Sequence, residues 1–172
     1  MSLILTGNTS NITIDSTSGI TFPNSTLQAS AGVVLQVVNL ATTTGFSSSS
    51  NVLSDTAVTA TITPKFATSK ILVLVNMSSC GKETNSTYIR AALLRGSTIL
   101  EYFENIGAFT SSTAFNYIGS LSTCYLDSPA TTSPTTYKVQ GSSGFNNAIV
   151  YFGGTAATIN ATHTMTLMEI AA

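Results

Sequence analysis

Three side chains are the first candidates for acid–base chemistry in this sequence. The single histidine, His163, and the one close pair of carboxylates, Glu101 and Glu104, are the types of group that hydrolytic enzymes use. A catalytic triad would need His163 beside a serine and an acid, and the sequence has no Gly-x-Ser-x-Gly nucleophile motif. On a strand, Glu101 and Glu104 would point to opposite faces because they are three residues apart. We therefore predict no catalytic residue and no enzyme: His163 is a polar residue at a strand start, and the two carboxylates are solvated or interface groups.

Metal and cofactor sites are not indicated either. The seven carboxylates are scattered along the chain, and no Gly-x-x-x-x-Gly-Lys-Ser phosphate loop is present. Cys80 and Cys124 are far apart and lack the close spacing of a zinc or redox motif. Their apolar, strand-like surroundings predict two buried free thiols, although the sequence leaves open whether they ever pair. The expectation is a protein with no metal and no cofactor.

The charge content excludes several classes of partner. Only 8% of the residues are charged, against about 25% in an average globular protein. The net charge of -1 provides no basic stripe for a phosphate backbone, so nucleic acid is not an expected partner. No apolar run reaches the roughly 18 residues of a membrane span, and the first residues lack the charged start of a signal peptide. We expect a soluble protein that does not insert into membranes.

The elements that would position these side chains are strands. Residues 56–64 alternate apolar and Thr side chains with period two, and the nearly continuous β-branched run at 69–79 predicts a strand covered on both faces. Gly96-Ser97 interrupts any helix drawn through 87–109. The expected strands are 33–40, 56–64, 69–79, 87–96, 97–109, 113–126, 135–141, 147–154 and 163–170. This pattern predicts an all-β fold, an antiparallel two-sheet β-sandwich of the jelly-roll type, with the strand order left open.

The first 32 residues differ from the rest of the chain in composition and in the length of their apolar runs. They are rich in Ser, Thr, Asn and Gly, and their apolar residues form very short clusters between turns. Strands of this length cannot repay their ordering entropy alone, so we expect the segment to be disordered or completed by other chains. We divide the chain into an attachment or stem segment, 1–32, and a sandwich domain, 33–172. The candidate attachment residues are Ile12, Ile14, Ile20, Phe22, Pro23 and Leu27.

The closing strand suggests oligomerisation. Met165 and Leu167 lie on one face of residues 163–170 and Met168 on the other, so both faces are partly apolar. The sequence also lacks the Lys and Glu residues that usually protect strand edges from pairing with other chains. We predict a closed homotrimer, with Met165, Leu167 and Met168 as candidate interface residues.

Residues 19–32, GITFPNSTLQASAG, resemble a short motif of tailed-phage fibre and appendage proteins, in which a Gly-Ile-x-Phe strand turns at Pro-Asp-Gly-Thr and continues as x-Gln-x-x-Ala. Asn24-Ser25 replaces the usual Asp-Gly, and serine favours a turn with positive φ less than glycine does. The matching residues are Gly19, Ile20, Phe22, Pro23, Thr26, Gln28 and Ala31. The remainder resembles the small sandwich modules of phage structural proteins, through ITPKFATSKILVLVNM (62–77), YLDSPATTSPTTYKVQ (125–140) and MTLMEIAA (165–172).

The resemblance implies a virion protein. In that family the N-terminal strands of three chains associate around a threefold axis or dock on the virion, and the sandwiches form a distal knob. It implies a short trimeric tail fibre whose N-terminus docks on the tail or baseplate and whose knob binds a host cell-surface glycan. The alternative is a trimeric capsid decoration protein that contacts the major capsid protein, and a glycan-cleaving enzyme is the third class. Phe145 with Asn146 and Asn147 is the candidate host-surface contact, because a Gly/Ser/Asn loop that carries an aromatic ring suits neutral sugars.

Overall fold

The computed structural model describes residues 20–21, 27–28, 33–153 and 161–171 of the chain. These residues form strands and loops, and none of them lies in a helix long and apolar enough to cross a membrane. The strands are β1 (Ile20–Thr21), β2 (Leu27–Gln28), β3 (Val34–Thr42), β4 (Phe46–Ser48), β5 (Ser54–Ile62), β6 (Lys70–Lys82), β7 (Ile89–Arg95), β8 (Thr98–Gly107), β9 (Asn116–Asp127), β10 (Thr135–Ser143), β11 (Val150–Phe152) and β12 (His163–Ile170).

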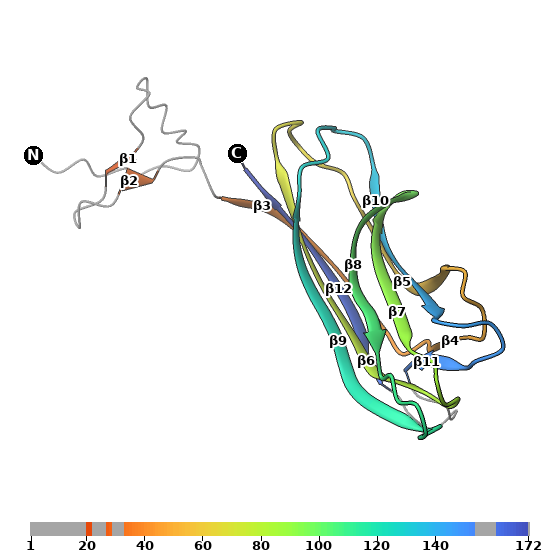
Figure 1. Ribbon diagram of the computed structural model, residues 1–172. Helices are drawn as coiled ribbons and strands as arrows, with labels where there is room; N and C mark the ends of the chain where they lie inside the picture. Colours follow the sequence, from red (N-terminus) through yellow and green to blue (C-terminus); the bar gives the residue numbers. More distant parts are fainter. Residues whose placement is uncertain (1–19, 22–26, 29–32, 154–160, 172) are drawn as a thin grey trace, which may run out of the picture.

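Two antiparallel sheets pack face to face (Figure 1). The small sheet has the order β5-β10-β7-β8. The large sheet has the order β3-β12-β6-β9, and β11 with β4 continues it beside the C-terminal end of β6. The pairs β3–β12, β5–β10, β6–β9 and β7–β8 are nested in sequence, so the chain follows the path of one long hairpin wound over two sheets. This path is the double Greek key of a jelly roll, which confirms the predicted fold class.

Alternating side chains build the core. In β12 every second residue is buried, and β5 and β10 follow the same period over most of their length. The inward side chains of both sheets meet in one cluster, as the period-two pattern requires. Its largest members include Tyr137, Phe152, Ile62, Ile71, Met77, Ile89, Leu93, Met165 and Leu167.

The β7–β8 hairpin confirms the choice of strands over a helix at 87–109. Gly96 has φ of +58°, which is strained for residues with a side chain, and the chain reverses there. Leu94 pairs with Ile99 and Arg95 pairs with Thr98 across the turn. The Gly96-Ser97 interruption therefore marks the turn of a hairpin.

The structure corrects the prediction that Met165 and Leu167 form a trimer interface. Both side chains have 0% exposure and face the small sheet, so no partner chain can contact them. Met168 faces the other way and is partly exposed. Sequence alternation separated the two faces of 163–170 correctly but could not say which one the second sheet covers.

Two further expectations are corrected. Cys124 is exposed, because it lies on the outer face of β9, whereas Cys80 is buried as predicted. The strand predicted at 69–79 to be covered on both faces has only one buried face, and Leu72 and Leu74 on its other side are partly exposed. In addition, β4 lies in a polar stretch that gave no strand signal.

The N-terminal segment contains a short antiparallel pair. Ile20 pairs with Gln28 and Thr21 with Leu27 in antiparallel register, while the predicted Pro-Asn-Ser-Thr turn lies outside the described residues. Ile20 and Leu27, two of the candidate attachment residues, lie in this pair. The other four, Ile12, Ile14, Phe22 and Pro23, lie outside the described residues. The attachment role of all six stays a prediction.

Candidate functional site

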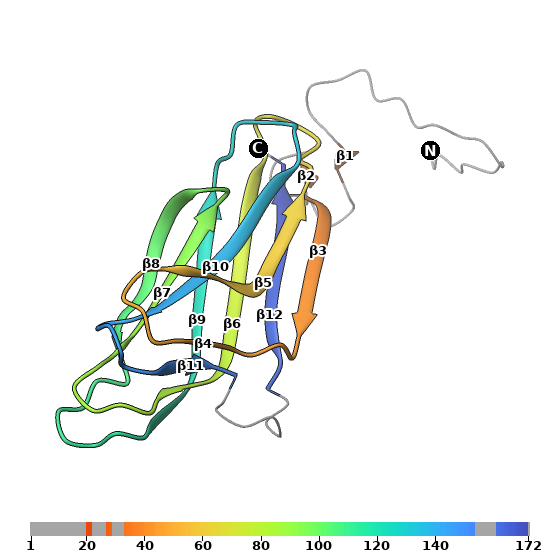
Figure 2. The same cartoon turned by 90° about the vertical axis from the view of Figure 1, so that its right-hand side faces the viewer.

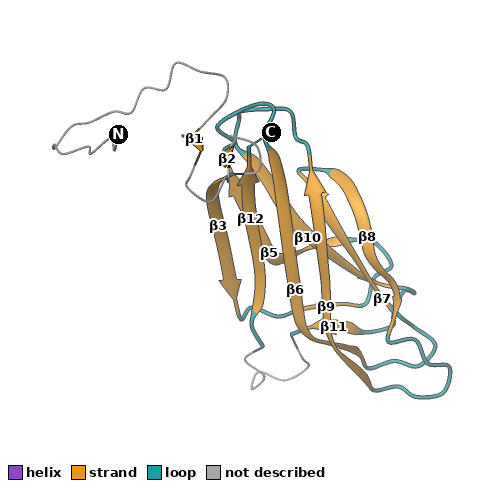
Figure 3. Cartoon of the chain, turned by 90° about the vertical axis from the view of Figure 1, so that its left-hand side faces the viewer, coloured by secondary structure: helices purple, strands orange, loops and turns teal. Residues whose placement is uncertain are grey.

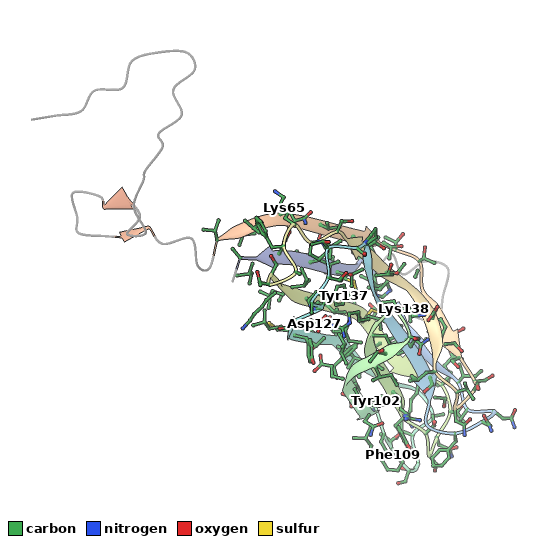
Figure 4. The ribbon with its side chains drawn as sticks, turned by 90° about the horizontal axis from the view of Figure 1, so that it is seen from above. Lys65, Tyr102, Phe109, Asp127, Tyr137 and Lys138 are labelled. Atoms are coloured by element: carbon green, nitrogen blue, oxygen red, sulfur yellow. The ribbon has the colours of Figure 1, made fainter. Side chains whose placement is uncertain are left out.

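The loops of the sandwich gather at two opposite ends (Figure 3). The chain enters β3 at one end, where the backbone N–H of Ala171 donates to the carbonyl of Val33 at 2.9 Å. At the other end lie loops 83–88, 108–115 and 144–149, which we call the tip (Figure 2). Lys65, in the loop after β5, and Phe109, in the tip, mark the two ends in Figure 4. The ends therefore differ in which parts of the chain they can present to partners.

Three aromatic rings form a cluster in the tip, one from each loop. The ring of Tyr88 lies edge-on to Phe109, with centroids 6.5 Å apart, and to Phe145, with centroids 5.6 Å apart. Phe109 and Phe145 are 48% and 52% exposed, so both residues are accessible to a ligand. A Cβ atom at Gly144 would lie 2.5 Å from the Tyr88 ring, so only glycine allows this ring to rest on the loop backbone.

Amide groups lie beside this cluster. Asn146 and Asn147 are both exposed, and Asn147 has a positive φ of 62°, a conformation that asparagine tolerates better than most residues. The side-chain Oδ1 of Asn146 accepts a hydrogen bond from the backbone N–H of Asn51 at 3.0 Å. The backbone N–H of Asn147 donates to the carbonyl of Ser49 at 2.7 Å. The structure thus brings Phe145, Asn146 and Asn147 to an exposed loop that is held in place by its neighbours, while their binding role stays a prediction.

A buried ammonium group ties the tip together. Lys82, at the end of β6, has 0% exposure, and its Nζ donates to the carbonyls of Thr84, Thr110 and Thr113 at 3.0, 3.1 and 2.9 Å. Burial lowers the pKa of Lys82 from its ordinary value. This lysine joins loops 83–88 and 108–115, which supply two of the three aromatic rings. Sequence reasoning missed it, because a lysine that follows a strand looks like an ordinary surface residue.

Replacing Lys82 by methionine should lower the free energy of unfolding by about 1–2 kcal/mol, because methionine keeps most of the buried volume but donates no hydrogen bond. Amide hydrogen exchange in loop 108–115 should become faster. Lys65→Met is the control, since the exposed Lys65 Nζ donates only to the Leu35 carbonyl at 3.2 Å and its loss should change stability by less than about 0.5 kcal/mol. Equal effects of the two substitutions would contradict the anchoring role.

The other sequence candidates are not brought together. His163 is 1% exposed at the start of β12, where its Nδ1 accepts a hydrogen bond from the backbone N–H of Ser78 at 3.1 Å and burial lowers its pKa. Glu101 accepts a hydrogen bond from Thr123, whereas Glu104 accepts from the backbone N–H groups of Asn105 and Ile106. Their hydrogen bonds therefore connect the three groups to different parts of the sandwich. Among the described residues no group of three or more His, Cys, Asp or Glu side chains is placed to hold a metal ion.

Comparison with known proteins adds little. No family model and no curated protein matches the sequence. Among solved structures, the VP2 subviral particle of infectious bursal disease virus aligns over 81% of this chain with 13% identity and a TM-score of 0.44. The structure of the Gt strain of the same virus aligns over 81% with 15% identity and a TM-score of 0.37. This chain covers only 39% of either viral chain.

Proposed function

We propose that the chain is a structural, non-enzymatic virion protein of a tailed bacteriophage. It forms a short homotrimeric tail fibre: residues 1–32 dock on the tail or baseplate, and the jelly roll is a knob that binds a host cell-surface glycan. The observation that carries the proposal is the exposed cluster of aromatic rings and amides at the tip. The end of the sandwich where Val33 enters is the opposite one, so attachment and recognition would not compete for space.

The chemistry of the tip suits an uncharged sugar. The exposed parts of Phe109 and Phe145 present apolar ring surface against which the C–H faces of a sugar can pack. Asn146 and Asn147 carry amide groups that donate to and accept from hydroxyls. The exposed aromatic and amide side chains of these three loops can therefore bind a ligand that carries no charge.

The test is binding of the full-length protein to an array of purified bacterial cell-surface polysaccharides. Phe145→Ala should weaken binding about tenfold, equivalent to about 1.4 kcal/mol, because the aromatic face is lost. Phe66→Ala is the matched control: Phe66 is 56% exposed but lies in the loop after β5 at the other end, so its loss should leave binding unchanged.

Other outcomes would redirect the proposal. Binding to empty phage capsids and to no polysaccharide would overturn the fibre in favour of a capsid decoration protein. Shortening of a bound polysaccharide by the pure protein would overturn the non-enzymatic part, and substitution of Glu101, Glu104 and His163 would then be the next step.

A further inference from the structure

A row of aliphatic side chains crosses the outer face of the large sheet. Strand register places Val37 opposite Met168, Met168 opposite Leu72, and Leu72 opposite Leu126. We call these four residues the apolar row. Val37 and Leu126, at its ends, are 54% and 50% exposed, and the two central side chains are partly exposed. The row therefore lies on the outer surface of the sandwich, on the side away from the small sheet.

The surroundings of the apolar row extend it. Towards the Val33 end, Ile170 pairs with Val34, which is 49% exposed. Towards the tip, Leu74 pairs with Cys124, an exposed free thiol. The charged residues in the strands of this sheet are Glu169, Asp127 and Lys82, which are buried, and Lys70, which is exposed. The apolar surface ends at the exposed hydrogen bond between Thr166 and Asn39 towards the tip and at Lys70 towards the Val33 end. An apolar patch with a polar rim of this kind is typical of an interaction site.

The outer face of the small sheet is charged and polar over β5 and β10, although β8 also carries the exposed Ile99 and Ile106. The Nζ of Lys138 lies 2.8 Å from Asp55 Oδ1, and Gln140 donates to the same carboxylate at 2.6 Å. The guanidinium of Arg90 lies 5.4 Å from the ring centre of Tyr102. These charged and polar groups suit contact with water, so the two outer faces differ in what they are suited to contact.

We propose that the outer face of the large sheet is where copies of this chain contact one another, with the apolar row close to the threefold axis. The inference rests on the homotrimer of the proposed function and specifies its interface. Residues 1–32 lead into the sandwich at Val33, beside Val34 and Ile170, so a stem made from three chains would bring three copies of this end together. Joining the chains there raises the effective concentration of one row near the next.

The first test is the oligomeric state of the full-length protein by native mass spectrometry and analytical ultracentrifugation. Val37→Glu combined with Leu126→Glu would place six carboxylates in the interface, and burial of unpaired charge is strongly unfavourable. We expect trimers of the wild type and monomers of this double variant, because strands as short as those expected in residues 1–32 cannot hold three chains together without the contact between the sandwiches. Ile99→Glu is the matched control, because Ile99 is 40% exposed but lies on the small sheet, near the end of the sandwich where Val33 enters. This variant should remain trimeric.

Cys124 gives a second measurement that does not depend on mass. A partner copy that covers the large sheet should slow the reaction of Cys124 with a thiol reagent in the wild type and in Ile99→Glu, but not in the double variant. Cys80 should not react with the reagent in the wild type or in either variant, because burial raises the pKa of its thiol to about 12. Circular dichroism of the double variant checks that the sandwich is intact.

The outcomes separate this inference from the proposed function. A wild type that is monomeric overturns both the homotrimer and the interface. A double variant that remains trimeric, with a reactive Cys124 in the wild type, overturns the interface alone and leaves the fibre standing. The interface is supported if the double variant is monomeric and its Cys124 reacts rapidly, while Cys124 of the wild type reacts slowly.

Discussion

Replacing Asp127 by alanine is expected to lower the free energy of unfolding by about 3 kcal/mol, because it leaves a cation and a buried hydroxyl without their acceptor. Asp127 ends β9 in the large sheet and is 6% exposed. Its Oδ1 and Oδ2 accept from Nη1 of Arg95 at 2.8 and 2.7 Å, and Oδ2 also accepts from the hydroxyl of Tyr137 at 2.6 Å (Figure 4). Both donors belong to the small sheet, so this carboxylate joins the two layers.

The hydroxyl of Tyr137 is suited to donating a hydrogen bond to Asp127. Burial, reinforced by the hydrogen bond to Asp127, raises the pKa of Tyr137, so its hydroxyl stays protonated and continues to donate. The loss in the variant should therefore be similar from neutral to mildly alkaline pH.

Urea unfolding of the wild type, Asp127→Ala and a control checks this expectation. Asp55→Ala is the control, because the exposed pair of Asp55 with Lys138 should contribute only about 0–1 kcal/mol. If the two variants lose equal stability, the contacts of Asp127 between the sheets do not contribute the expected free energy of unfolding.

Glu169→Gln is expected to lower the free energy of unfolding by about 3 kcal/mol at pH 7 and by much less at acidic pH. Glu169 has 0% exposure in β12, and its carboxylate accepts from the backbone N–H of Lys65 at 2.6 Å and from Nε2 of Gln36 at 2.5 Å. A glutamine there would direct its own N–H groups at one of these donors. The contacts tie the loop after β5 to two strands of the large sheet.

The sign of the pH dependence follows from the pKa of Glu169. Burial alone would raise this pKa, but hydrogen bonds from Gln36 and from the backbone N–H groups of Lys65 and Phe66 outweigh burial and lower it below the ordinary 4.5. A carboxyl whose pKa is lowered by folding stabilises the protein above the unfolded-state pKa. That stabilisation is lost as the pH falls through the folded-state value.

Urea unfolding at pH 7 and pH 3 measures the difference between the wild type and Glu169→Gln. Glu83→Gln serves as the control, because Glu83 is only partly buried and its substitution should change stability little at either pH. Parallel pH dependence of the wild type and Glu169→Gln would show that another group causes the acid sensitivity.

The sequence by itself determined most of the local structure. Period-two alternation of apolar and Thr side chains placed the strand at 56–64 close to its observed bounds. Apolar runs bounded by turn residues placed the strand at 163–170 with its observed bounds and the strand at 135–141 close to them. Gly96-Ser97 argued against a helix at 87–109, and the structure places the turn of the β7–β8 hairpin there. The exposure of Phe145, Asn146 and Asn147 followed from a loop too rich in Gly, Ser and Asn to be core.

Only the tertiary structure decided what each face contacts. Met165 and Met168 both lie on apolar faces of one strand, and only the position of the small sheet decides that Met165 is buried and Met168 is not. Lys82 became an anchor because loop 108–115 turns the carbonyl oxygens of Thr110 and Thr113 towards it, which no local pattern encodes. The apolar row likewise exists only because register aligns one residue from each of four strands. These contacts join residues that are far apart in sequence, so they depend on strand order, which the alternation within a single strand does not specify.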